Sequence, residues 1–364
     1  MENIRTNSKD KLRIIWAIAY KDILDGLRNK TILSTLFSVF LIFILFKVGP
    51  TLWYGNRLPR LVVYDAGNSD LIEKLGDSTA FDLRPVASQQ DLESYLGYED
   101  FEMLGLVLPA DIDQHIQNDK QIVLDGFFDH WISDSAIAEI KTFYETQLGN
   151  LVGLPVILNI HNDNVFTHQD GGFPIRISIV ITIALVLIGL SVTGYLVIEE
   201  KETKTLEVLM VSPASPGQVV IGKAVTGLFY CMVVVIAILV FNTKFIIHWE
   251  VLLPAVIIGA LFSVASGLWL GSILNGKQQI NMWVFILVQP LLIPVFLSIM
   301  RDLLPESFLM VIQWIPTVAL TNALRLGFSY QAPLGVVGPA LAYVAVSALL
   351  LLSLVTWTVR RSDR

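Results

Sequence analysis

The sequence carries little charge for its length. Of its 364 residues, 16% are Asp, Glu, Lys or Arg and 54% are hydrophobic, whereas a soluble domain carries about 25% charged residues. The shortage is concentrated in a few long apolar blocks, while residues 53–172 have an ordinary soluble composition. This uneven distribution is typical of a membrane protein that carries one large extramembrane domain.

Cysteine is almost absent. Cys231 is the single one and lies inside an apolar stretch, which excludes a disulfide-stapled secreted fold. The sequence also lacks a basic patch with interleaved aromatic residues, so nucleic acid is not expected as a partner. The five histidines have no paired ligand spacing, and no metal site is expected.

A complete phosphate-binding loop is missing. Residues 217–224, GQVVIGKA, approach the pattern G-x-x-x-x-G-K-[ST], but Ala224 replaces the Ser or Thr that should hold magnesium, and no strand precedes the segment. We interpret Gly222 and Lys223 as marking the start of an interfacial helix. The chain is therefore not expected to bind ATP or another cofactor on its own, and neither catalytic residues nor enzyme activity are predicted.

Long apolar runs are what the sequence does contain. A membrane-spanning helix needs roughly 20 mostly apolar residues. Six segments meet or approach that length: Ile32–Val48, Ile175–Ile198, Ala224–Thr243, Val251–Leu274, Met282–Met300 and Leu334–Val359. The expected fold class is an α-helical polytopic membrane protein with six transmembrane helices and an inserted, extracytoplasmic mixed α/β domain.

The distribution of basic residues predicts the orientation. Fourteen Lys and Arg residues lie in short segments on the side of the N-terminus, against three in the short loops of the other side, so both termini should be cytoplasmic. We expect a multi-pass protein of the plasma (inner) membrane. Its predicted segments are a cytoplasmic N-terminus with an interfacial helix (1–31), the first transmembrane helix (32–52), the outer domain (53–173) and the remaining helices (174–364).

The outer domain alternates short apolar runs with helical stretches, which is typical of a small mixed α/β domain. Strands are expected at Arg60–Asp65, Glu102–Leu108 and Gln121–Phe128. Helices are expected at Asp70–Leu75, Gln89–Tyr98 and Ser133–Leu148. The order of the strands does not follow from these runs.

An amphipathic helix is predicted before the first apolar block, over Leu12–Asn29. Trp16 and Leu24 recur at helical spacing with other apolar residues, while Lys21, Asp22 and Arg28 lie largely opposite. This pattern indicates a helix lying in the cytoplasmic membrane interface.

Two further features concern the other apolar blocks. The stretch at about 303–330 is apolar but interrupted by Pro305 and Pro316, which favours two short re-entrant helices on the outer side. Ser263, Gly267 and Gly271 recur at every fourth position of the fourth span. Such a stripe of small residues predicts a close helix-packing face.

The middles of the predicted spans lack Asp, Glu, Arg and His, so no proton or ion relay is evident and energy must come from elsewhere. The loop after the second span is charged, yet a short helix at about 203–211 would align Leu206, Leu209 and Met210 on one side. Such a helix can dock into a groove on a partner. The alternative is a helix that lies on lipid.

These residues carry a family resemblance. The segment EEKETKTLEVLMVSPASPGQVVIGK (199–223) looks like the signature loop of type-2 ABC transporter permeases, although Lys204 stands where family members often have Gly. YKDILDGLRNKTIL (20–33) is similar to the family's elbow helix, and WIPTVALTNALRLGF (314–328) resembles its outer re-entrant region.

The resemblance implies that the loop forms a coupling helix against a separate ATPase subunit. The residues assigned to this coupling on the resemblance are Glu199, Glu200, Glu202, Thr205, Leu206, Glu207, Leu209, Met210 and Pro213. Two cytoplasmic ATPase subunits would bind ATP and Mg, and a second permease subunit, identical or different, would complete an export pathway at the dimer interface. The sequence does not identify the exported substrate.

Two rival functions stay open on the sequence alone. A membrane sensor or assembly protein would bind a ligand with its external domain and dock a partner with the loop. An ion-coupled transporter would move its substrate without ATP. Co-purification with an ATPase subunit separates the first rival from the permease, and transport without ATP would identify the second.

Overall fold

The computed structural model describes residues 8–54, 58–98, 103–118, 121–128, 134–161, 172–202, 215–298, 304–328 and 334–362. The chain divides into two compact units. The helical unit comprises residues 1–47, 177–328 and 332–364, and the α/β unit comprises residues 48–176 and 329–331. The chain leaves the helical unit after Lys47, within the helix Lys30–Tyr54, and returns to it at Ile177, within the helix Gly172–Glu202.

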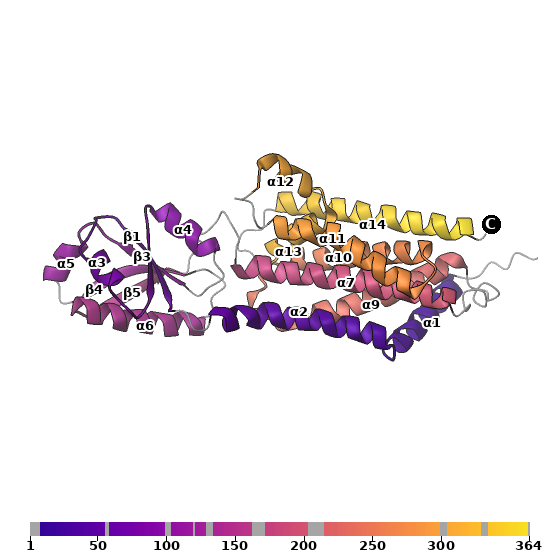
Figure 1. Ribbon diagram of the computed structural model, residues 1–364, viewed down its shortest axis with the longest axis horizontal. Helices are drawn as coiled ribbons and strands as arrows, with labels where there is room; N and C mark the ends of the chain where they lie inside the picture. The colour runs from indigo at the N-terminus through magenta and orange to yellow at the C-terminus, as the bar shows by residue number, and fades with distance from the viewer. Residues whose placement is uncertain are drawn as a thin grey trace, which may run out of the picture. The chain divides into compact units, whose positions relative to one another are not determined.

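Long helices make up the helical unit (Figure 1). They are α1 (Ser8–Gly26), α2 (Lys30–Tyr54), α7 (Gly172–Glu202), α9 (Pro216–Val240), α10 (Trp249–Ile273), α11 (Lys277–Leu297) and α14 (Leu334–Ser362). A 3-10 turn, Thr243–Phe245, precedes α10. Six of the long helices, all except α1, are long and apolar enough to cross a membrane, which agrees with the six predicted spans.

Helices α7 and α10 form the centre of this unit, where 78% and 72% of their most apolar windows are buried. Small residues allow this close approach. A Cβ atom on Gly267 would collide with the backbone oxygen of Gly189, and one on Gly271 would lie 2.9 Å from the backbone oxygen of Gly194. The stripe of Ser263, Gly267 and Gly271 therefore lies directly against α7.

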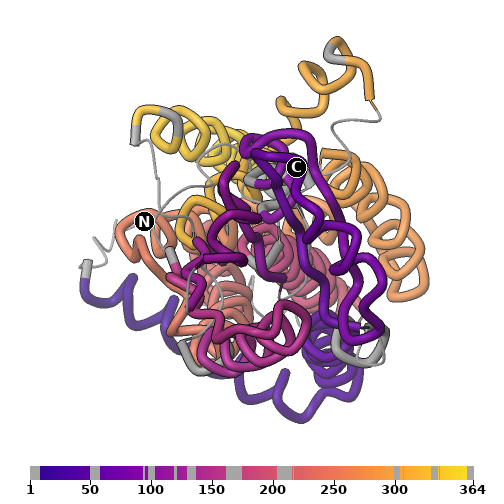
Figure 2. Tube along the Cα trace, turned by 90° about the vertical axis from the view of Figure 1, so that its left-hand side faces the viewer, coloured from indigo at the N-terminus to yellow at the C-terminus, as the bar shows by residue number. Residues whose placement is uncertain are grey.

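Helices α2, α11 and α14 lie around the outside of the bundle (Figure 2). Only 17%, 22% and 22% of their most apolar windows are buried. Their outward faces carry large apolar residues, among them Phe37, Phe285 and Leu349, which are 67%, 69% and 65% exposed. These faces are suited to contact with lipid or with another apolar protein surface.

Two short helices occupy the stretch predicted to be re-entrant. They are α12 (Glu306–Ile312) and α13 (Pro316–Leu326), and each is too short to span a bilayer. Helix α13 is buried on most sides, and the hydroxyls of Thr321 and Thr182 on α7 lie 2.9 Å apart in its interface.

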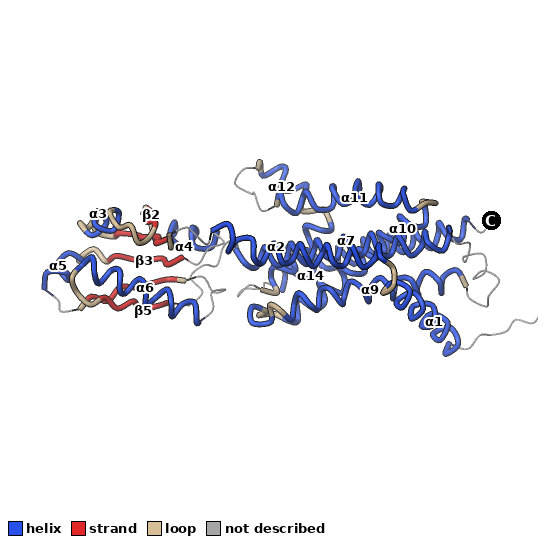
Figure 3. Tube along the Cα trace, turned by 60° about the horizontal axis from the view of Figure 1, so that its bottom comes forward, coloured by secondary structure: helices blue, strands red, loops and turns tan. Residues whose placement is uncertain are grey.

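The α/β unit contains a five-stranded sheet of order β2-β1-β3-β4-β5 (Figure 3). The strands are β1 (Arg60–Asp65), β2 (Asp82–Val86), β3 (Met103–Leu108), β4 (Ile122–Phe127) and β5 (Val156–His161). The helices are α3 (Leu71–Gly76), α4 (Gln89–Tyr98), α5 (Ile112–Asn118) and α6 (Asp134–Val152). Neighbouring strands are parallel except β3 and β4, which are antiparallel.

Each face of the sheet has its own apolar cluster. Leu61 and Val63 point to one face, where they join residues of α3, α5 and α6, while Val62 points to the other and meets Leu92 and Leu96 of α4. The alternation follows from the period of two along a strand. The mixed α/β architecture agrees with the sequence analysis; the location of this unit outside the membrane stays a prediction.

Candidate functional site

The last turn of α7 is a run of four charged residues, Glu199, Glu200, Lys201 and Glu202. It ends an apolar helix and directly precedes residues 203–214. Such a run could face solvent, but each of its side chains contacts another helix or a helix connection. We call these four residues the α7 charged turn.

Glu199 and Glu202 bind the start of α11. One oxygen of Glu202 accepts the backbone N–H of Lys277 at 2.9 Å, and the Lys277 ammonium lies 3.6 Å from both carboxylates and over the ring of Tyr195. Asn29, between α1 and α2, donates to Glu199 at 3.3 Å. A carboxylate at a helix N-terminus is favoured because unpaired N–H groups and the positive end of the dipole lie there.

Lys201 binds the end of α10. Its ammonium donates to the backbone oxygens of Ser272 and Leu274 at 2.7 and 2.8 Å. The last carbonyls of a helix have no partner within the helix, and a lysine can satisfy them. The α7 charged turn thus holds the neighbouring ends of α10 and α11.

Glu200 belongs to a buried cluster of three charges. The Lys223 ammonium on α9 lies 2.9 Å from the Glu200 carboxylate and 3.3 Å from that of Asp22 on α1. Side-chain exposures are 3% for Lys223, 8% for Glu200 and 6% for Asp22. Lys223 also donates to the backbone oxygen of Leu196 on α7 at 3.1 Å. We call Asp22, Glu200 and Lys223 the buried triad.

Helix α1 lies along the first turns of α9 (Figure 1). A Cβ atom on Gly222 would lie 2.8 Å from Ile18, so this glycine lets the two helices touch. Further along α9, Thr226 donates to the backbone oxygen of Ala19 at 3.3 Å and Tyr230 donates to that of Ile23 at 2.7 Å. Both helices are therefore joined by side-chain bonds as well as by the buried triad.

The predicted faces of α1 need a correction at Asp22. The sequence placed Asp22 on the charged face, but its residue exposure is 4% and it faces α9, four positions from Ile18. Burial is tolerated because Lys223 neutralises it. Trp16 and Leu24 are 62% and 42% exposed, whereas Ala19, predicted for the same stripe, is fully buried beside α9, so only part of the apolar stripe is exposed. Lys21 and Arg28 are exposed as predicted.

The predicted coupling residues divide into two groups. Thr205, Leu206, Glu207, Leu209, Met210 and Pro213 lie outside the described residues. Glu199, Glu200 and Glu202 are in the α7 charged turn. Glu200 was assigned to coupling on the resemblance; its carboxylate is buried against Lys223, so it is not exposed for a direct contact, and its part in coupling stays a prediction.

Sequence reasoning missed Lys223 as a site residue. Its signal was present, because a lysine within the apolar span of α9 requires a carboxylate partner. Lys223 was considered only as part of the incomplete phosphate-binding loop at 217–224 and as the start of an interfacial helix. Its partner Asp22 is 201 positions away in the sequence, which no local pattern can reveal.

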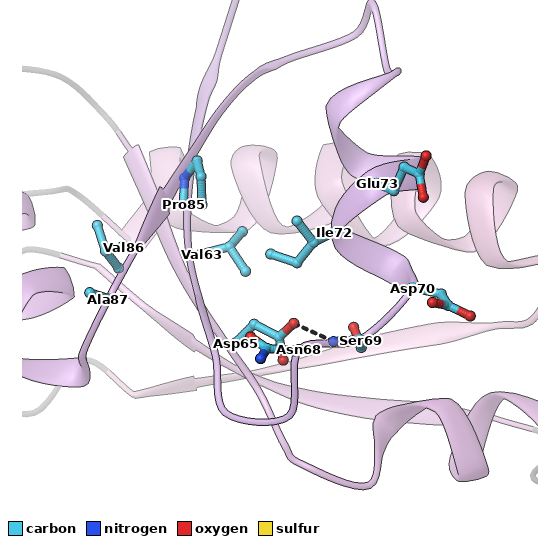
Figure 4. Close-up of a pocket in the computed structure, with 10 residues that line it drawn as sticks. All are labelled: Val63, Asp65, Asn68, Ser69, Asp70, Ile72, Glu73, Pro85, Val86 and Ala87. Carbon is cyan, nitrogen blue, oxygen red and sulfur yellow. Dashed lines mark hydrogen bonds between the residues drawn. The ribbon is translucent and has the colours of Figure 1, made fainter.

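The α/β unit has a cavity of about 410 Å³ beside α3 and the ends of β1 and β2 (Figure 4). Asp65, Asp70 and Glu73 make it acidic. The Asp65 carboxylate accepts the backbone N–H groups of Gly67 and Ser69 at 2.9 and 2.6 Å, so it shapes the turn into α3. Among the described residues no group of three His, Cys, Asp or Glu side chains could hold a metal ion.

The described residues include six helices of spanning length, which is the architecture of a polytopic membrane protein. Buried charges gather where α1, α7 and α9 meet, next to the residues that flank the loop at 203–214. Residues 30–357 match the model of the ABC-2 family transporter proteins. The chain belongs to this family.

Two curated relatives resemble the chain. Both are described as "Probable multidrug ABC transporter permease YbhR", one from Escherichia coli strain K12 and one from E. coli O157:H7. Each is 25% identical over 300 residues, which is 76% of this chain and 79% of the relative. The similarity extends over most of both chains and supports the role of an ABC transporter permease.

Proposed function

We propose that this chain is the transmembrane permease subunit of an ABC exporter and that the loop at 203–214 receives the movement of separate ATPase subunits. The observation that carries the proposal is the α7 charged turn, in which four consecutive residues contact α11, α9 and α10 and the connection before α2. A force applied to the loop reaches this turn first, because the loop begins at the next residue.

Closely packed helices with defined bonds transmit displacement as rigid bodies. The loop leaves α7 at Glu202 and re-enters the helical unit at α9, and both ends are bound to neighbouring helices. This arrangement suits a docking helix at about 203–211 that contacts a partner through Leu206 and Leu209. Other residues assigned to coupling would lie beside this contact: Glu199, Glu202, Thr205, Glu207, Met210 and Pro213.

The energy source in this proposal is ATP bound with Mg by the partner subunits. The chain's own phosphate-loop segment ends in Ala224 in place of Ser or Thr, and its family consists of ABC permeases. Export is favoured because the relatives are described as multidrug permeases. A second permease subunit, identical or different, would complete the pathway at the apolar outer faces of the bundle.

The proposed location is the plasma (inner) membrane, with both termini, α1 and the loop in the cytoplasm and the α/β unit outside. The excess of Lys and Arg on the side of the termini supports this orientation. Helix α1 would then lie at the cytoplasmic membrane surface, with Leu12, Trp16 and Leu24 toward lipid.

The test is co-purification of an ATPase subunit encoded beside this chain. Wild-type protein should retain it, and Leu206→Asp with Leu209→Asp should release it, because two charges would enter an apolar contact. Leu58→Asp with Val123→Asp is the matched control, since both residues are exposed on the α/β unit (51% and 60%).

Binding that survives the loop variant would rule out the coupling role. If no ATPase subunit binds at all, the sensor or assembly function is favoured, with the acidic cavity of the α/β unit as its ligand site.

A further inference from the structure

The buried triad closes the base of the loop. Glu200 lies in the last turn of α7 before residues 203–214, and Lys223 lies about two turns inside α9 after them, so their 2.9 Å ion pair joins the two helices that flank the loop.

The Lys223 ammonium has three oxygen partners. It donates hydrogen bonds to Asp22 and to the backbone oxygen of Leu196 at 3.3 and 3.1 Å, and it forms an ion pair with Glu200 at 2.9 Å. An ammonium distributes three donors around one nitrogen, whereas a guanidinium is a planar fork. The site is therefore built for lysine, and arginine is not an equivalent replacement.

The two sides that Lys223 joins are each connected internally by other bonds. On one side, α1 and α9 are linked through Thr226 and Tyr230. On the other side, α7 is linked to α10 through Lys201 and to α11 through Glu202. Lys223 connects the first pair to the second group at the level of the loop.

We infer that Lys223 is a positioning residue that clamps the loop base, so that α1 and α9 move together with α7 when the loop is displaced. This inference rests on the proposed function, because it requires a partner that displaces the loop. The triad has two carboxylates, one ammonium and low exposure. It therefore favours one alignment of α1, α7 and α9, since sliding one of these helices along another would leave a buried carboxylate unpaired.

Distances between spin labels test the clamp in the permease with its ATPase subunit, reconstituted in lipid nanodiscs. One pair, Tyr20→Cys with Ile221→Cys, lies within α1 and α9; the other, Tyr20→Cys with Ile273→Cys, connects α1 to α10. These three positions are 62%, 50% and 48% exposed, and the native Cys231 is fully buried. Both distances are measured without nucleotide and after trapping with ATP and vanadate.

In the wild-type background both distances should be the same in the two states. In Lys223→Met the distance from α1 to α10 should change by roughly 2–5 Å on trapping, the scale of helix shifts in switching proteins, while the distance within α1 and α9 stays constant. An α1–α10 distance that changes equally in wild type and Lys223→Met overturns the clamp.

Two further variants protect the result against misfolding. Asp22→Asn, Glu200→Gln and Lys223→Met together remove all three charges, so no buried charge is left unpaired, and this variant should show the same change of distance. Lys244→Met, at an exposed lysine of the 3-10 turn before α10, is the matched lysine control and should behave as wild type. If an ATPase subunit binds and traps nucleotide but the α1–α10 distance does not respond to Lys223→Met, this inference alone is disproved. If no ATPase subunit binds, the proposed function is disproved.

Discussion

Lys223 is a residue whose charge is held almost entirely away from water. Its side chain is 3% exposed and contacts two carboxylates of comparable burial. A buried ion pair contributes little net stability compared with an apolar contact of the same shape, but removal of one partner leaves an uncompensated charge. The triad therefore fixes how α1, α7 and α9 are aligned more than it adds to the free energy of unfolding.

Replacement of Lys223 should therefore destabilise the protein strongly. We expect Lys223→Met to lower the free energy of unfolding by about 3–5 kcal/mol, because Asp22 and Glu200 remain buried and unpaired. Lys277→Met, at a side chain that is 38% exposed, should cost about 0–1 kcal/mol. Denaturant unfolding in detergent measures both. Equal losses for the two variants would contradict the burial argument.

Tyr144 in the α/β unit gives a prediction about pH. Burial, with Asp82 nearby, raises the pKa of Tyr144, and its hydroxyl has no hydrogen-bond partner among the described residues. The folded state keeps this proton when the unfolded tyrosine ionises near about pH 10. Stability is then unaffected below that pH and falls as the pH rises above it.

Tyr144→Phe should remove this alkaline loss and leave stability at neutral pH equal or slightly higher, because an unsatisfied hydroxyl disappears. Unfolding midpoints at neutral and strongly alkaline pH provide the measurement. Tyr20→Phe, at a residue that is 62% exposed, is the control and should leave the alkaline loss in place. A Tyr144→Phe variant with the wild-type pH profile would contradict the assignment.

At the scale of elements, the sequence predicted what local patterns encode. The six spans follow from apolar length, and β1, β3, β4, α3, α4 and α6 follow from apolar runs and helical periodicity. Strand β2 was missed because its sequence, DLRPV, has no apolar run and it lies at a sheet edge, where a proline is tolerated. Strand β5 (VILNIH) and α5 (IDQHIQN) were also missed, although they are as long as the predicted β1 and α3, because polar residues interrupt their apolar pattern.

The candidate site was predicted only in part for the same reason. The charged residues before the loop were identified, but their partners Lys277, Ser272 and Lys223 come from other helices. Helical periodicity assigned Asp22 to the solvent side because it records polarity and not pairing. Contacts between elements decide whether a charge at a helix boundary faces water or another charge.

Packing of α7 against α10 gives a prediction for a whole element. A Cβ atom on Gly267 would meet the backbone oxygen of Gly189 and could not be accommodated by a side-chain shift. We expect Gly267→Ala to destabilise the helical unit by about 1–3 kcal/mol through overpacking. Thermal unfolding of the purified protein measures the effect.

The matched control for this prediction is Gly338→Ala on α14, where nothing lies within 4 Å of the added Cβ. This change should be neutral or stabilise the helix by about 0.5–1 kcal/mol, since alanine has the higher helix propensity. A loss at Gly338 as large as that at Gly267 would show that the contact with α7 does not determine the result, since helix propensity favours alanine at both positions.

The whole molecule is divided into a helical unit with apolar outer faces and an α/β unit with a core of its own. The charge distribution adds a direction: basic residues gather with the termini and the loop, and the positive-inside rule supports the proposal that these segments are cytoplasmic.

Cysteine labelling tests this orientation directly. Val123 in the α/β unit is 60% exposed, Lys21 on the polar face of α1 is exposed, and Cys231 is buried and should not react. A membrane-impermeant maleimide should label Val123→Cys in intact cells and Lys21→Cys only after the membrane is opened, because the α/β unit is proposed to lie outside. Labelling in the reverse order would place the loop on the outer side, where ATPase subunits fuelled by cytoplasmic ATP could not reach it, and would exclude the coupling role of residues 203–211.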